Sequence, residues 1–135
     1  MSGGTIKDMD DYLEKVNSAP FAKFMSIRII ELSPDTVRGE METGENLVNH
    51  FGGVHGGAIM AFADYLFGVA ANMFENPSVA IDFSISFFSP AKPGQKLQGE
   101  GRVLRKGKRT INVELTVKQN ERIIAKALAT AMFVD

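Results

Sequence analysis

Two features of the sequence predict an α+β fold in which an antiparallel sheet wraps around one long buried helix. The first is residues 58–74, where apolar residues recur at the i, i+3, i+4 and i+7 spacing of a helix and also occupy its opposite face. The second is a series of strand-like segments, two before this helix and four after it, that are joined by tight turns. Short connections favour antiparallel pairing, and a helix that is apolar nearly all round must be enclosed.

The other elements follow from periodicity and from turn residues. Residues 6–16 carry apolar side chains at helical spacing and predict a short amphipathic helix, over about 6–18, that ends before Pro20. Residues 21–25 predict a turn or half-helix. In the second strand after the long helix, Gly99 and Gly101 predict a bulge or a strong bend. The expected strands are residues 26–32 and 36–43, which form a hairpin, and then 78–89, 96–105, 110–118 and 122–134.

Length and composition limit the possible functions. The 135 residues fit a single domain over 1–135, and 44% apolar with 23% charged residues is ordinary globular composition. A formal net charge of −1 gives no support to nucleic-acid binding, and the lack of cysteine excludes disulfides and thiol catalysis. Residues 1–4 are expected to be mobile. The charged segment 1–16 lacks the apolar run of a signal peptide, so we expect a soluble, cytoplasmic protein with no membrane partner.

Asp64 is the most informative single residue. It lies in the middle of the apolar helix, and no basic residue occurs between Gly56 and Phe74. Because a buried charge without a partner costs several kcal/mol, Asp64 should either open onto a wet cleft or receive partners from elsewhere. A purely structural role remains open, in which the carboxylate accepts backbone hydrogen bonds at a kink or interface. The helix is apolar on more sides than one sheet covers, which favours a dimer.

The order of helices and strands resembles that of the hotdog-fold acyl-CoA thioesterases. Two segments carry the resemblance: NHFGGVHGGAIMAFAD at residues 49–64 and SVAIDFSISFFSPAKPG at residues 78–94. The similar branch is the one associated with phenylacetic acid degradation and with thioesterase superfamily member 2. The resemblance implies hydrolysis of a medium-chain or aryl acyl-CoA to free acid and CoA, with no cofactor beyond that substrate. It also implies a homo-oligomer, dimer or homotetramer, with active sites at the dimer interface.

By this resemblance, Asp64 is the catalytic carboxylate, acting as general base or as nucleophile. Gly56 supplies a backbone N–H to the oxyanion, and glycine at a helix start lets a substrate carbonyl approach closely. Asn49 would hold the attacking water or the thioester oxygen, although its residue type also suits an ordinary turn. His55 joins the catalytic set, with a local structural hydrogen bond as the alternative. In this family the asparagine and glycine of one subunit face the aspartate of the other.

The phosphates of CoA require cations, and the resemblance places the substrate path at residues 87–92 and 105–110. A solvated basic turn is the alternative for the second segment. Phe62, Tyr65 and Phe88 are candidates for the acyl pocket, unless they belong to the core. The expected substrate- and CoA-binding residues are Gly57, Phe87, Phe88, Ser89, Pro90, Lys92, Arg105, Lys106, Lys108 and Arg109.

The sequence departs from the family at Ala80, where relatives often carry serine or threonine near the catalytic carboxylate. The missing hydroxyl leaves open a non-catalytic acyl-CoA-binding module. A hotdog acyl dehydratase or hydratase is the other alternative. Metal binding is not expected, because His50 and His55 lie in a glycine loop without further ligands, and His50 has no matching role.

Overall fold

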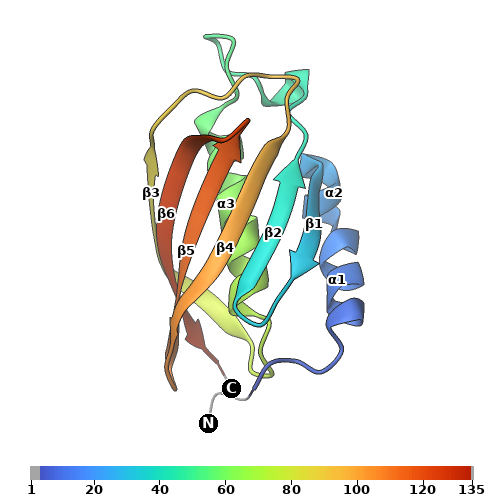
Figure 1. Cartoon of the computed structure of the whole chain (residues 1–135), viewed down its shortest axis with the longest axis vertical. Coiled ribbons are helices and arrows are strands. Elements are labelled where there is room, and N and C mark those ends of the chain that lie inside the picture. The colour runs from blue at the N-terminus through green and yellow to red at the C-terminus, as the bar shows by residue number, and fades with distance from the viewer. Residues whose placement is uncertain (1–3, 135) are drawn as a thin grey trace.

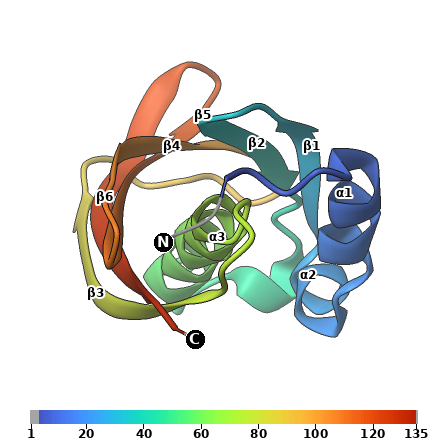
Figure 2. The same ribbon diagram turned by 90° about the horizontal axis from the view of Figure 1, so that it is seen from below.

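The structure is a computed structural model that describes residues 4–134. A six-stranded antiparallel sheet curves around α3, as Figure 1 and Figure 2 show, and this confirms the predicted α+β architecture. The strand order is β1-β2-β4-β5-β6-β3, and α1 and α2 lie beside β1 at one edge of the sheet. The elements are α1 (Met9–Ser18), α2 (Pro20–Met25), β1 (Ile27–Leu32), β2 (Thr36–Met41), a 3-10 turn (Glu45–Leu47), α3 (Gly56–Ala71), β3 (Ser78–Phe87), β4 (Leu97–Lys106), β5 (Thr110–Gln119) and β6 (Arg122–Phe133).

The first helix starts later than the sequence predicts. It begins at Met9 instead of Ile6, because the side chain of Asp8 accepts a hydrogen bond from the N–H of Asp11 at 2.9 Å and caps the helix there. The N–H of Ile6 instead bonds to the carbonyl of Met73, which ties the N-terminal segment to the end of α3. Of the segment 1–4 that was expected to be mobile, residues 1–3 lie outside the described residues.

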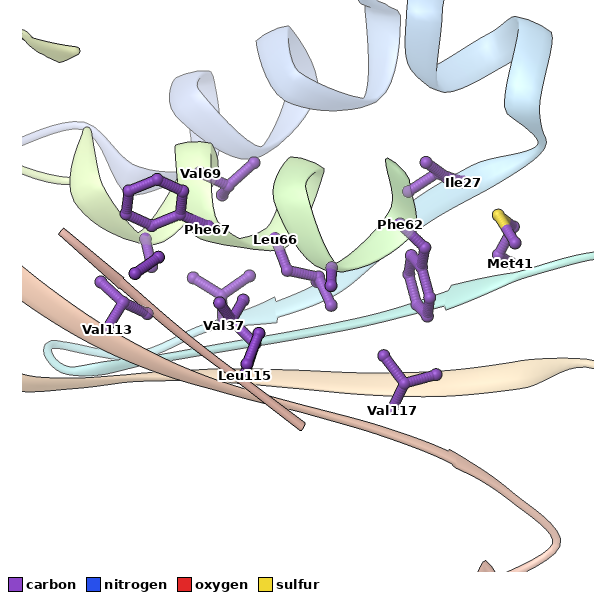
Figure 3. Packing of buried hydrophobic residues seen from close by; sticks show 14 of the residues in the cluster. Ile27, Val37, Met41, Phe62, Leu66, Phe67, Val69, Val113, Leu115 and Val117 are labelled. Atoms are coloured by element: carbon purple, nitrogen blue, oxygen red, sulfur yellow. The ribbon is translucent and has the colours of Figure 1, made fainter. Parts of the chain in front are cut away.

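The core lies between α3 and the concave face of the sheet. Figure 3 shows Phe62 and Leu66 of α3 pointing toward Val37, Leu115 and Val117 on the strands. On β5 all buried positions but the last carry large aliphatic residues, whereas on β6 all of them but Ile124 are alanines. Alanine takes little room, so the sheet can curve tightly there and bring β3 back toward α3. The buried β6 alanines are Ala125, Ala127, Ala129 and Ala131.

Close contact between α3 and β4 explains a glycine that the sequence left ambiguous. A Cβ built on Gly99 would lie 2.3 Å from Cδ1 of Leu66 and 2.8 Å from Cζ of Phe62, so no side chain fits there. The bulge of β4 lies instead between Val103 and Arg105. The predicted bulge at the glycines is therefore wrong, and Gly99 serves the packing of helix on sheet.

The strand β3 leaves an apolar edge open. It ends the sheet and pairs with β6 on one side only. Val79 and Ile81 are 49% and 54% exposed, which is high for large aliphatic side chains in a strand. Unpaired edges with exposed apolar residues favour pairing with another chain.

Candidate active site

The helix α3 begins with a histidine cap. Nδ1 of His55 accepts a hydrogen bond from the N–H of Gly57 at 2.8 Å, and the His55 carbonyl accepts from Ala58 and Ile59. The structural alternative for His55 is therefore what the structure shows. Among residues 4–134, no acceptor faces the N–H of Gly56. This unsatisfied donor lies at the positive end of the helix dipole, where it favours negative charge.

Asn49 holds the loop that leads to this helix. Its Oδ1 accepts hydrogen bonds from the N–H groups of Phe51 and Gly53, at 2.9 and 3.1 Å. Because both partners are donors, the amide orientation is fixed and Nδ2 is the group left over. Within the described residues Nδ2 has no acceptor. Asn49 is thus a turn residue that also keeps one donor available.

A hollow of about 540 Å³ lies between this loop, the start of α3 and the end of β3. Most of its lining is apolar, and Phe51, which is 85% exposed, stands at its rim. Phe51 is not among the predicted site residues, although a large aromatic residue in an exposed glycine loop can indicate a binding site. The predicted site residues that the structure brings together here are Asn49, Gly56, Phe87, Phe88, Ser89 and Pro90.

Asp64 does not reach this hollow within the same chain. It follows Gly56 by two turns of α3, which is about 12 Å along the helix axis. Its side chain is exposed, and among residues 4–134 it has no hydrogen-bond or ion-pair partner. Partial burial by its apolar surroundings raises the pKa of the Asp64 carboxyl above its usual value. The carboxylate therefore faces an open surface, as the wet-cleft alternative expects, and it is not tied to the backbone.

The basic hairpin lies far from the hollow. Arg105, Lys106, Lys108 and Arg109 occur where β4 turns into β5, at the opposite end of the sheet from the loop after β3 (Figure 1). The ten residues of β4 separate the two ends by about 30 Å. Nζ of Lys106 lies 5.1 and 5.4 Å from the ring centroids of Phe74 and Phe133, so its cation stabilises local packing.

Two acyl-pocket candidates are not in the hollow. Phe62 is fully buried in the core, which is the alternative expected for it. The hydroxyl of Tyr65 donates a hydrogen bond to the carbonyl of Val16, and burial raises the pKa of Tyr65. Ala80 lies exposed on β3. Lys92 lines a separate hollow together with Gln119, Asn120 and Arg122.

Across residues 4–134, no three His, Asp or Glu side chains come together as possible metal ligands. The ring of His50 packs on that of Phe51 at a centroid distance of 4.0 Å. Over the same range, no helix combines the length and the apolar character that crossing a bilayer requires.

Comparison with known families identifies the class of protein. The sequence matches the model of the Thioesterase superfamily over residues 51–125, more than half of its length. The chain therefore belongs to the thioesterase superfamily. It is similar to acyl-coenzyme A thioesterase 13 of Homo sapiens, with 32% identity over 108 residues that cover 77% of each chain. It is also similar to a putative esterase of Archaeoglobus fulgidus, with 29% identity over 131 residues, 96% of this chain and 84% of the relative.

Solved structures confirm the hotdog fold. The Escherichia coli PaaI protein from the phenylacetic acid degradation operon superposes with a TM-score of 0.89 at 21% identity, covering 94% of this chain and 93% of that one. The smu.793 protein of Streptococcus mutans, bound to acetyl CoA, gives a TM-score of 0.77 at 25% identity, covering 80% and 88%. Family and relatives together support thioester hydrolysis as the general activity.

Proposed function

We propose that this protein hydrolyses medium-chain or aryl acyl-CoA thioesters and binds the thioester carbonyl at the N–H of Gly56. The observation that carries the proposal is this unsatisfied donor, which opens into an apolar hollow at the start of a buried helix. An N–H at a helix start is preorganised for the oxyanion that forms during acyl transfer. The acetyl CoA bound to smu.793 and the name of acyl-coenzyme A thioesterase 13 support CoA esters as the substrate class.

The chemistry needs a second donor and a base. Nδ2 of Asn49 is the second donor, held in place because Oδ1 is occupied by the loop. As general base, Asp64 takes a proton from water, the hydroxide adds to the carbonyl carbon, and the tetrahedral oxyanion expels the CoA thiolate, which is then protonated. As nucleophile, Asp64 would instead form a mixed anhydride that water cleaves. Neither route requires a cofactor.

A second copy of the chain would bring Asp64 to the hollow. In one chain Asp64 and Gly56 are too far apart to touch the same carbonyl. The open edge of β3, with exposed Val79 and Ile81, and the exposed side chain of Met60 one turn before Asp64 give a surface that a copy can cover. A two-fold dimer would create two equivalent sites, and a dimer of dimers would keep them.

Thiol release from a panel of acyl-CoAs tests the proposal. Asp64→Asn keeps the shape of the side chain and removes its charge, so we expect kcat/KM to fall by about 100-fold or more. Asp10→Asn on the exposed face of α1, away from the β3 edge, is the matched control and should retain activity. Tight binding of CoA esters without turnover in the wild type would contradict the proposal and favour a binding module.

A further inference from the structure

The side chain of Gln119 is a buried amide at the end of an otherwise aliphatic row. Along β5 every second residue is buried, and all of these are large and aliphatic until Gln119, which is 6% exposed. A buried amide costs free energy unless its polar groups find hydrogen-bond partners. An aliphatic side chain at this position would extend the core without that cost. The partners of the amide therefore indicate what it does.

Both ends of this amide bind the loop that follows β3. Oε1 of Gln119 accepts a hydrogen bond from the N–H of Lys92 at 2.8 Å. Nε2 donates to the carbonyls of Lys92 and Gln95, at 2.9 and 3.0 Å. Because one end of the amide meets a donor and the other meets two acceptors, its orientation is fixed. Gln119 therefore holds the backbone of the loop in one place.

The same peptide group also binds the segment that leads into α3. The carbonyl of Ala91 belongs to the peptide group that carries the N–H of Lys92, and it accepts a hydrogen bond from the N–H of Val54 at 3.0 Å. A Cβ built on Gly53 would lie 3.6 Å from this carbonyl and 4.0 Å from Nδ2 of Asn49. One peptide group thus connects the buried amide to the loop of the candidate active site.

Val54 is the point where this connection reaches the two oxyanion donors. Gly56 follows Val54 by two positions, and Gly53, directly before Val54, donates a hydrogen bond to Oδ1 of Asn49. A displacement of Val54 would therefore move the N–H of Gly56 and the amide of Asn49 together. Gln119 itself lies outside the lining of the hollow and does not touch that space.

We propose that Gln119 is a positioning residue for thioester hydrolysis, which sets the oxyanion donors through the peptide group between Ala91 and Lys92. The inference rests on the proposed function and adds to it a residue that touches no substrate. Hydrogen bonds in series polarise and strengthen one another, and a fully satisfied buried network specifies one arrangement. Oxyanion donors act through such preorganisation, because they do not rearrange during the reaction.

The test uses Gln119→Met, which keeps the length of the side chain and removes all three hydrogen bonds. We expect kcat to fall by about 10–100-fold, since displacements of about 1 Å are costly in an active site. KM should stay close to the wild-type value, because the donors act in the transition state. Tyr12→Phe is the matched control, because it removes one hydrogen bond, to the carbonyl of Val69 near the other end of α3. It should lower Tm and leave kcat unchanged.

Hydrogen exchange reads the same connection without turnover. In Gln119→Met the N–H of Val54 should lose protection, whereas the N–H of Val103, bonded to the carbonyl of Asp35, should not. If Gln119→Met does not fold, Gln119→Glu, which keeps an acceptor for the N–H of Lys92, takes its place, with smaller losses expected in the same direction.

Three outcomes would overturn the inference: unchanged kcat in a folded Gln119 variant, unchanged protection of Val54, or an equal loss of kcat in Tyr12→Phe. The first of these would leave the proposed function intact. Failure of the wild type to hydrolyse any thioester would refute the proposed function and the catalytic part of the inference. Protection of Val54 that still depends on Gln119 would then keep only the structural connection.

Discussion

Asn49 carries two roles on one amide, and a pair of substitutions separates them. Asn49→Ala removes the acceptor of two hydrogen bonds, to the N–H groups of Phe51 and Gly53. At 0.5–1.5 kcal/mol each, the loss is about 1–3 kcal/mol, or roughly 3–10 °C in Tm for a chain of this size. Asn49→Asp keeps a carboxylate oxygen for both N–H groups and replaces only Nδ2. Its Tm should therefore stay close to that of the wild type.

Activity should respond in the opposite order to stability. Loss of one oxyanion donor lowers kcat by about 10²–10³, so Asn49→Asp should be nearly inactive while fully folded. The assays are thermal unfolding by circular dichroism and thiol release under saturating acyl-CoA. If Asn49→Asp hydrolyses substrate at the wild-type rate, Nδ2 takes no part in the reaction. Asn49 would then be a turn residue alone.

Predictions at three further positions test other parts of the structure. Because burial raises the pKa of Asp64, kcat/KM should fall on acidification with a midpoint above the usual aspartate value of 3.8, and pH–rate profiles measure this. A raised carboxyl pKa in the folded state also means that stability declines as pH rises through it, so thermal melts of Asp64→Asn should lack this decline. His55→Ala should lose about 1 kcal/mol of stability, and His55→Asn, which can still cap Gly57, should regain it in urea unfolding. Gly99→Ala should cost about 1–3 kcal/mol or more in urea unfolding, because its Cβ meets Leu66 at 2.3 Å, and a variant as stable as the wild type would contradict the packing described.

The sequence allowed the elements to be predicted because their signals are local. The alternation of residues 78–87 predicts β3, and the apolar periodicity after Gly57 predicts α3. The start of α1 at Met9 could also have been predicted, since Asp8 is a good N-cap residue three positions before Asp11. The need for glycine at position 99 could not be predicted this way, because it arises from contact with residues more than thirty positions away.

The candidate site was only partly predictable, for a physical reason. The resemblance pointed to Asn49 and Gly56, which share one loop and one helix start, and it also implied that Asp64 faces them from another subunit. The sequence did not show that the hairpin at 105–109 lies at the other end of β4. The role of Gln119 carried no local signal at all, because only the fold brings its amide to the backbone of Lys92.

The central claim is that Asn49 and Gly56 of one chain act with Asp64 of another. Asp64→Asn and Asn49→Asp chains with different tags are co-expressed and purified in tandem. The resulting hetero-oligomers contain one chain that lacks Asp64 and one that lacks Asn49. If sites form between chains, one site in each mixed pair is intact, and we expect about half of the wild-type thiol-release rate. Each variant alone should be nearly inactive. Mixed pairs that are as inactive as the two parents would contradict the account, because a site within one chain cannot be rescued by its neighbour.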